Sequence, residues 1–499
     1  MIRASVDLLV VGGGINGVGV ARDAAGRGLS VLLVESNDLG GATSSASSKL
    51  IHGGLRYLEQ FEFRLVAEAL REREVLLHAA PHLVHPMRFV MPHVPELRPA
   101  WMIRAGLYLY DFLARRQTLP GSAGVDFLQA PYSGILKPAL QRGYAYSDCC
   151  VDDARLVIAT ARSAASCGAQ IRPRTKCTLL RRDGLLWRAS LRPASGEAEE
   201  IQAKMVVNVT GPWAKSFLTE VARINVPFGL RLVQGSHIIV PRLYEGTHAY
   251  ILQNDDRRVV FAYPYETRYT LIGTTDVELT GAPEHCTAST QEISYLCRAV
   301  NRYFRGIVTE QDVVHSYAGI RPLFDDGAGN PSQITRDYVL RMIGDPHSAA
   351  ILSVFGGKIT TYRRLAEEVV DALRPWFPQM SGRWTADTPL DGGELGAGGL
   401  AGLGQQAADE YPWLSATILD ALAHRHGRNL NAVLAGAEST VDLGPCLGAE
   451  LYAREIDWFM DHEWAATADD VLWRRTKYGL HLTPAQQHAV AAYMAQRLS

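Results

Sequence analysis

A glycine-rich turn between two apolar runs near the start of the chain constrains the fold more than any other feature. Residues 6–11 (VDLLVV) and 31–35 (VLLVE) are the apolar runs, and Gly12, Gly14 and Gly17 stand between them in the spacing Gly-x-Gly-x-x-Gly. Continuous apolar runs are typical of parallel strands buried on both faces, and the residues after the glycines recur at helical spacing. The pattern predicts a strand, a helix and a second parallel strand with a right-handed crossover.

Each position of this turn has a physical reason. The first glycine permits the turn, the second lets a pyrophosphate approach the backbone, and the third allows close packing of the helix, whose N-terminus favours negative charge. Glu35 ends the second run, where its carboxylate can accept hydrogen bonds from ribose hydroxyls. The glycine spacing alone is a weak signal, but with the strands, the helix and the acid in register it predicts a dinucleotide site.

The rest of the chain favours FAD over NAD. A second glycine-ended strand is expected at 205–213, and a third strand and glycine turn around 349–358. An extended FAD molecule needs several distant segments to enclose it, whereas an NAD-dependent enzyme more usually shows a contiguous six-strand unit. The alternative is that the later glycines only close loops between strands and helices.

Composition excludes several classes of protein. Fifty basic residues against 52 acidic ones give a formal charge of -2, so the chain has no overall field for gathering nucleic acid. The seven cysteines include no Cys-x-x-Cys pair, which argues against a disulfide scaffold and against a zinc site. We therefore expect the protein to reside in a reducing compartment, the cytoplasm, and to bind no metal. No apolar run reaches the roughly 18 residues that a membrane span needs, although attachment to a membrane surface stays open.

The length of 499 residues predicts several domains. Short β-branched runs between turn residues predict an antiparallel sheet over 224–317, the glycine-rich stretch 391–404 predicts a linker, and the residues beyond it are expected to be helical. We therefore expect an α/β protein with an FAD-binding domain at 1–80, 147–223 and 318–385, a substrate domain at 81–146 and 224–317, and a C-terminal helical domain at 386–499.

Several longer motifs carry a resemblance. SSASSKLIHGGLRYLE, YSDCCVDDARL, RLVQGSHIIVP, FGGKITTYRRLAE and EWAATADDVLWRRTKYGL occur in the same order, within a likeness that runs from Val6 to Leu480, as in the bacterial FAD-dependent glycerol-3-phosphate dehydrogenases. The chain resembles this family, whose members are aerobic and membrane-associated. The resemblance implies a Rossmann-like FAD domain of the D-amino-acid-oxidase/glutathione-reductase-like type.

The resemblance also implies an activity. Members of the family oxidise sn-glycerol 3-phosphate to dihydroxyacetone phosphate, passing a hydride from C2 to N5 of FAD and then electrons to a membrane quinone. A monotopic position on the inner face of the cytoplasmic membrane follows from the same resemblance, and a homodimer is left open. The alternatives are a glycerol-3-phosphate oxidase that reduces oxygen and a flavin-binding scaffold without dehydrogenase activity.

A dianionic substrate needs fixed cations, and arginine offers two donors to a phosphate. The resemblance assigns Arg56, Tyr57, Arg321 and Arg336 to the phosphate or the neighbouring hydroxyls, with Arg321 also in the catalytic group. Without such a motif, an arginine is expected at the surface or in a salt bridge, and we expect this of most of the other arginines in the chain.

Three further side chains are expected to take part in catalysis. Imidazole is the usual base for a hydroxyl proton, and His237 and His52 both lie in matching motifs. We prefer His237 as the base, because His52 follows the serine-rich loop and could contact the flavin instead. Lys358 follows two glycines at the start of an expected helix, where its charge would stabilise the pyrimidine edge of reduced flavin.

The cofactor contacts expected from the turn and from the resemblance are spread over the chain. They are Gly12, Gly14, Asn16, Gly17, Glu35, Thr43, Ser44, Ser47, His52, Gly53, Gly211, Trp213, Gly319, Lys358 and Thr360.

Residues 99–117 are the candidate for membrane attachment. They combine aromatic and aliphatic side chains such as Trp101 and Phe112 with arginines such as Arg104, a mixture typical of interfacial helices. A buried amphipathic helix explains the same pattern equally well.

Overall fold

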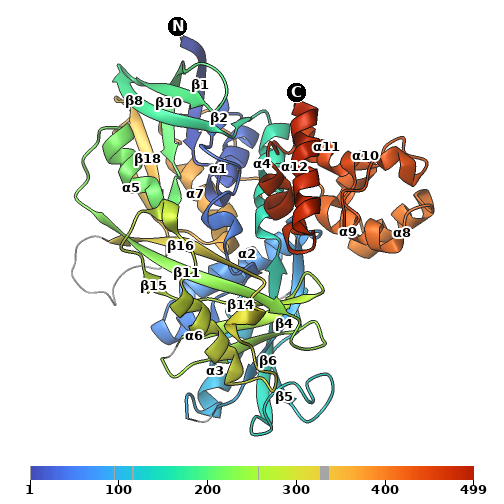
Figure 1. The fold of residues 1–499 in the computed structure, drawn as a ribbon. Helices are drawn as coiled ribbons and strands as arrows, with labels where there is room; N and C mark the ends of the chain where they lie inside the picture. Colours follow the sequence, from blue (N-terminus) through green and yellow to red (C-terminus); the bar gives the residue numbers. More distant parts are fainter. Residues whose placement is uncertain (1, 95, 115–116, 257, 326–336, 499) are drawn as a thin grey trace.

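The structure is a computed structural model that describes residues 2–94, 96–114, 117–256, 258–325 and 337–498. Within these residues, two large sheets are joined by crossing segments of chain, and a group of helices follows at the C-terminus (Figure 1). The first sheet has the order β17–β18–β10–β1–β2–β7, and a hairpin of β8 and β9 extends it from β10. Its strands are β1 (Ile2–Val11), β2 (Val31–Val34), β7 (Gln170–Arg172), β8 (Thr175–Asp183), β9 (Leu186–Pro193), β10 (Glu199–Asn208), β17 (Val339–Ile343) and β18 (Ala350–Phe355).

The centre of this sheet explains the apolar runs of the sequence. β1 pairs in parallel with β2 and β10, and β10 pairs in parallel with β18. Leu8 and Val10 belong to one buried cluster, whereas Leu9 and Val11 belong to another that contains Trp187. Strands buried on both faces have no polar side, so they read as continuous apolar runs.

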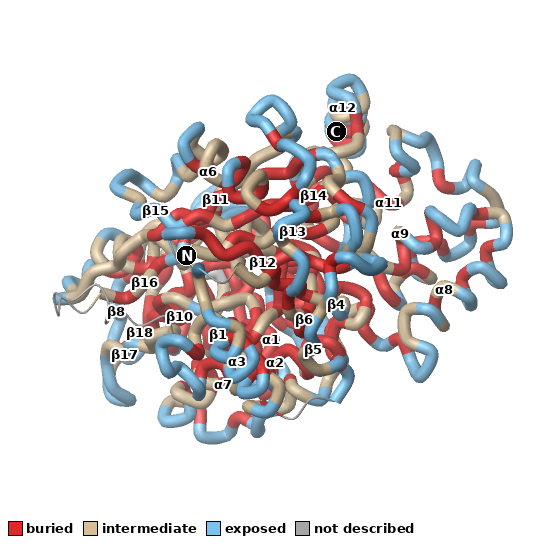
Figure 2. Tube along the Cα trace, turned by 90° about the horizontal axis from the view of Figure 1, so that it is seen from below, coloured by how far each residue is buried: buried red, intermediate tan, exposed pale blue. Residues whose placement is uncertain are grey.

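Helices α1 (Ile15–Gly26), α4 (Asp153–Ser166) and α7 (Tyr362–Ala372) cover the face of the first sheet that carries Leu8. Buried residues run through the interior of the molecule, and exposed ones lie mostly at its periphery (Figure 2). The predicted strand, helix and strand unit at the N-terminus is therefore confirmed, with β2 beside β1.

The second sheet has the order β15–β11–β14–β13–β12–β4–β6–β3, with β16 paired to β11 and β5 paired to β6. Its neighbours pair antiparallel, apart from the parallel pair of β4 and β12. Besides the predicted strands from 224–317, it includes β4 and β6 from the earlier part of the chain. Its strands are β3 (Leu50–Ile51), β4 (Val84–Pro92), β5 (Ala123–Asp126), β6 (Arg142–Val151), β11 (Gly229–Pro241), β12 (Ala249–Gln253), β13 (Val259–Tyr265), β14 (Tyr269–Gly273), β15 (Val277–Glu278) and β16 (His315–Asp325).

Two of these strands run past the domain boundaries expected from the sequence. β6 crosses position 147 and β16 crosses position 318, and both stay paired within the second sheet beyond those positions. The helices that pack on the second sheet are α2 (Phe63–Ala79), α3 (Ala100–Phe112) and α6 (Thr290–Asn301).

The C-terminal region is helical, as predicted, and lies beside α4 (Figure 1). The prediction of a linker over 391–404 is wrong in two respects. Helix α8 already begins at Gly399, and a Cβ at Gly392 would lie 2.4 Å from the carbonyl oxygen of His426, so this glycine permits close packing. The helices are α8 (Gly399–Glu410), α9 (Ala416–His426), α10 (Leu430–Val433), α11 (Ala453–His462) and α12 (Pro484–Leu498).

Candidate cofactor and substrate site

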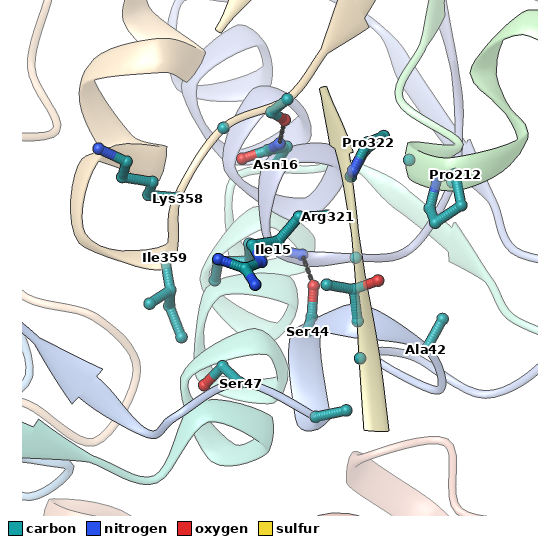
Figure 3. A pocket seen from close by; sticks show the side chains of 18 of the residues that line it. Ile15, Asn16, Ala42, Ser44, Ser47, Pro212, Arg321, Pro322, Lys358 and Ile359 are labelled. Carbon is teal, nitrogen blue, oxygen red and sulfur yellow. Dashed lines mark hydrogen bonds between the residues drawn. The ribbon is translucent and has the colours of Figure 1, made fainter. Parts of the chain in front are cut away.

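A cavity of about 1310 Å³ is lined by residues of both sheets. The turn before α1 and the loop after β2 form part of its wall, and β11, β16 and the segment 356–360 form another part. Figure 3 shows side chains from these separate segments converging on one space. The two sheets thus meet along the cavity, as a cofactor held by distant segments requires.

The glycine turn closes one part of the cavity. Gly12 has a φ of +118°, and a Cβ there would lie 2.5 Å from the carbonyl oxygen of Val209. A Cβ at Gly17 would lie 1.9 Å from the carbonyl oxygen of Gly12, so Gly17 supports the turn from inside α1. Only glycine fits either position without moving the backbone.

Polar groups around this turn are already oriented. The N–H of Gly13 donates to Glu35 Oε2 at 2.7 Å, and the N–H of Ile15 donates to Ser44 Oγ at 3.0 Å. The second of these bonds is drawn in Figure 3. A glycine turn at the N-terminus of a helix can bind the pyrophosphate of FAD, and a carboxylate at the end of the next strand can bind its ribose.

Three cations line the same cavity. They are Arg56, Arg321 and Lys358, and Lys358 Nζ lies 3.9 Å from the centre of the Tyr57 ring. Arg321, labelled in Figure 3, belongs to β16, and its guanidinium donates to the carbonyl oxygen of Thr275 at 3.3 Å. The fourth expected cation, Arg336, lies outside the described residues.

Lys358 precedes a 3₁₀ turn, Ile359–Thr361, that leads into α7. Asn16 Nδ2 donates to the carbonyl oxygen of Gly356 at 3.3 Å and so ties this segment to α1 (Figure 3). The N–H of His52 donates to Thr360 Oγ1 at 3.2 Å. The lysine therefore sits on a turn that is fixed from two sides.

Two histidines with low pKa values line the cavity. His237 is buried, its Nε2 lies 2.8 Å from Ser48 Oγ, and its ring stacks on Tyr317 at 4.8 Å. Burial, together with the charges of Lys49 and Arg321, lowers the pKa of His237 to about 3. Burial and the charge of Lys358 lower the pKa of His52 to about 4. Both rings are therefore unprotonated near pH 7, and the low pKa makes each of them a weaker base than a free imidazole.

The cavity brings together most of the residues expected from the sequence. Gly17 and Gly53 are not in its lining; the N–H of Gly53 instead donates to the hydroxyl of Tyr110 at 2.8 Å. The expected residues that line it are Gly12, Gly14, Asn16, Glu35, Thr43, Ser44, Ser47, His52, Arg56, Tyr57, Gly211, Trp213, His237, Gly319, Arg321, Lys358 and Thr360.

The sequence analysis missed other lining residues. Ser48, the partner of His237, stands in the serine-rich loop, so its place beside the expected contacts Ser44 and Ser47 was a usable signal. Ile251 and Phe261 line the cavity from β12 and β13, and nothing in their sequence separates them from ordinary core residues.

The first sheet and the cavity agree with a match to a known family. Residues 7–363 match the family described as FAD dependent oxidoreductase. This chain belongs to that family. It is therefore an oxidoreductase with FAD as its cofactor, and residues 383–499 match the C-terminal domain of alpha-glycerophosphate oxidase.

Relatives of known name cover nearly the whole chain. It is 52% identical over 488 residues to a glycerol-3-phosphate dehydrogenase of Pseudomonas aeruginosa, with 98% of this chain and 94% of the relative covered. It is 49% identical over 484 residues to a D-erythritol 1-phosphate dehydrogenase of Brucella abortus, with 97% and 96% covered. The structure of the glycerol-3-phosphate dehydrogenase from Bacillus halodurans complexed with FAD is similar at a TM-score of 0.77 and 26% identity, covering 99% of this chain and 90% of that one.

A buried hydroxyl supports the segment that carries His52. Tyr110 accepts from the N–H of Gly53 and donates to Asp148 Oδ2 at 2.6 Å, and Asp148 is also paired with Arg73 at 2.7 Å. We expect Tyr110→Phe to lower the free energy of unfolding by about 1–3 kcal/mol, because a buried N–H and a buried carboxylate oxygen each lose a partner. Tyr108→Phe is the matched control on the same helix.

Urea unfolding of both variants measures the difference. Tyr108 is 64% exposed, so its variant should stay within about 0.5 kcal/mol of the parent. Equal stability of the two variants would show that the hydroxyl of Tyr110 does not support the segment.

Proposed function

We propose that the protein oxidises sn-glycerol 3-phosphate to dihydroxyacetone phosphate and passes the electrons to a membrane quinone. The observation that carries the proposal is the pairing of three cations, Arg56, Arg321 and Lys358, with a neutral His237 in the wall of one cavity. A phosphorylated alcohol needs both: cations for its phosphate and a base for its hydroxyl. The names of the relatives agree with this substrate class.

In this proposal each cation has its own task. Arg321 and Arg56 bind the phosphate, and Tyr57 contributes its hydroxyl beside them. The phosphate and the cations then hold C2 of the substrate in one orientation. Arg336, expected to take part as well, stays a prediction of the sequence.

His237 takes the proton from the C2 hydroxyl, while the C2–H bond breaks and its electron pair leaves with the hydrogen. FAD, when bound, supplies the acceptor for this hydride at N5. Lys358 places its positive charge on the flavin side of the site, where negative charge develops on reduction. Ser48 fixes the ring of His237 through the bond to Nε2.

The residues that would hold FAD run along the whole cavity. The turn at Gly12 and Gly14 would hold the pyrophosphate and Glu35 the adenosine ribose. The other contacts are Asn16, Thr43, Ser44, Ser47, His52, Gly211, Trp213, Gly319 and Thr360, and Gly17 and Gly53 would act by supporting the backbone.

Steady-state turnover with defined substrates tests the proposal. We expect glycerol 3-phosphate to reduce a quinone analogue faster than D-erythritol 1-phosphate does, and unphosphorylated glycerol to be inert. The C-terminal match to an oxidase makes oxygen the second candidate acceptor. One hydrogen peroxide formed per turnover in air, without stimulation by the quinone analogue, would establish the oxidase instead.

We further propose that the protein lies on the inner face of the cytoplasmic membrane through α3. Ile103, Leu107 and Tyr110 form the buried stripe of this helix, whereas Trp101 and Phe112 are 69% and 65% exposed. No helix among the described residues is both long and apolar enough to span a bilayer. Exposed Met102, Tyr108, Leu109 and the neighbouring Phe61 enlarge the apolar face, which fits a helix lying in the interface. A homodimer stays a prediction.

Flotation with liposomes of anionic phospholipid tests this placement. We expect the double variant Trp101→Glu, Phe112→Glu to lose most of its bound fraction, because two carboxylates would enter the apolar boundary. Leu185→Glu is the control, since Leu185 is comparably exposed, at 62%, and lies in the turn between β8 and β9 of the first sheet. Equal binding of the parent and the double variant would remove α3 from the anchor.

A further inference from the structure

Side chains of the C-terminal domain hydrogen-bond to the loop after β2. We call residues 35–49 the cofactor loop, because most of its residues line the cavity. Asp38 is an exception: it points away from the cavity and its side chain is 3% exposed. A carboxylate buried to this degree needs partners, and its side chain accepts hydrogen bonds from the far end of the chain, while Arg174 lies 3.9 Å away.

Two consecutive arginines of the C-terminal domain bind Asp38. Arg475, which is fully buried, donates from both terminal nitrogens to the two carboxylate oxygens, one of them at 2.9 Å. Arg474 adds a third bond, from Nε to Oδ2 at 2.5 Å. Both arginines belong to the π-helical turn Asp470–Arg475. The forked geometry fixes the orientation of the carboxylate as well as its position.

The same turn reaches the loop by a second route. Asp470 accepts from Arg174, and the backbone N–H of Arg174 donates to the carbonyl oxygen of Asn37 at 2.9 Å. The N–H of Thr175 likewise donates to Glu35 at 2.7 Å. The connection between β7 and β8, which is hydrogen-bonded to the start of the cofactor loop, is thus tied to the C-terminal domain as well.

The far end of the loop is held through α4. Lys477 Nζ lies 2.9 Å and 3.0 Å from the carboxylate oxygens of Asp152, which caps α4 by accepting from the N–H of Arg155. The next residue, Asp153, accepts from Ser47 Oγ at 2.8 Å and from Lys49 Nζ at 2.7 Å. Lys477 therefore holds the helix turn that anchors the loop next to Ser48.

We propose that Arg474, Arg475 and Lys477 are positioning residues for FAD. They touch neither the cavity nor the substrate site, but they fix both ends of the loop whose backbone and side chains form the cofactor wall. In the simpler alternative these residues only dock the C-terminal domain. The two accounts differ in a measurable way, because docking contributes to stability whereas positioning also changes the affinity for FAD.

The experiment compares two interdomain arginines in the full-length holoenzyme. Arg475→Met breaks the contact with the loop, whereas Arg162→Met breaks the contact of α4 with Asp391 and with the carbonyl oxygen of His462, which involves no residue of the loop. We expect Arg475→Met to raise the dissociation constant of FAD at least tenfold, measured from the fluorescence of flavin released on dilution. Arg162→Met should change it less than threefold, although both variants lower the melting temperature.

A second variant keeps the test decisive if Arg475→Met fails to fold. Asp38→Asn preserves the size of the side chain and removes only its charge, and we expect the same tenfold weakening of FAD binding. The double variant Asp38→Asn, Arg475→Met should bind FAD no more weakly than Arg475→Met alone, because both changes break one contact. Equal FAD dissociation constants for the Arg475 and Arg162 variants, or parent-like FAD binding by Asp38→Asn, would overturn the proposal. The substrate does not enter either measurement, so the result is independent of the proposed function.

Discussion

His237→Gln is expected to slow the reduction of bound FAD by glycerol 3-phosphate about 10²–10³-fold in anaerobic single-turnover kinetics. The neutral imidazole is the group that takes the hydroxyl proton, and proton transfer to a positioned base contributes typically 10²–10⁴-fold. Glutamine preserves the size and a hydrogen bond to Ser48 but has no basic nitrogen at neutral pH. Binding of FAD should be unchanged, since the phosphate and ribose contacts lie elsewhere.

Two further variants show whether the loss is specific to His237. His52→Gln should slow reduction less than His237→Gln does, because its place beside Lys358 and Thr360 suits a contact with the flavin. His248→Gln is the matched control: burial lowers the pKa of His248 to about 4 as well, but it packs among tyrosines outside the cavity. Near-normal reduction in both the His237 and His52 variants would contradict the assignment of the base.

Arg321→Met is expected to lower kcat/KM for glycerol 3-phosphate roughly 10²-fold, mainly through KM. A charge-assisted hydrogen bond is worth about 1.5–3 kcal/mol, and 1.4 kcal/mol corresponds to a factor of ten. Among the described residues, Arg321 makes long contacts, to Thr275 at 3.3 Å and to Asp276 at 3.4 Å, which leaves the guanidinium available to a phosphate. Methionine keeps most of the side-chain volume and removes the charge.

Arg231→Met provides the comparison. Arg231 lies on β11 beside the strand of Arg321, pairs with Glu278 at 2.8 Å and does not line the cavity. Its variant should keep the parent kcat/KM within about threefold, because an exposed ion pair contributes at most about 1 kcal/mol. A similar loss in both variants, or a loss in kcat without a change in KM, would remove Arg321 from phosphate binding.

Local patterns predicted the first sheet and the pyrophosphate turn well. The continuous apolar runs at β1 and β2 indicate strands that are buried on both faces. The glycine at position 12 indicates that the backbone passes too close to Val209 for any side chain to fit. Both signals are carried by residues next to one another in sequence, so one sequence suffices to see them. The resemblance supplied the residue roles that such patterns cannot give.

Features that depend on distant partners could not be predicted. The pair of Asp38 and Arg475 joins residues 437 positions apart, and neither has a local pattern that names the other. The prediction of a linker over 391–404 failed for a related reason. Its glycines suggested a flexible segment, whereas Gly392 is required because the backbone of His426 leaves no room for a Cβ there. The buried stripe of α3 likewise became distinguishable from its exposed face only in the folded structure.

An anaerobic absorbance titration tests the central claim most directly. Purified protein with bound FAD is mixed with glycerol 3-phosphate in the absence of oxygen, and a quinone analogue is added afterwards. We predict that the visible absorbance band of the flavin bleaches with one equivalent of substrate per FAD and returns when the quinone analogue is added. A band that glycerol 3-phosphate leaves unchanged, while dithionite still bleaches it, would contradict the account.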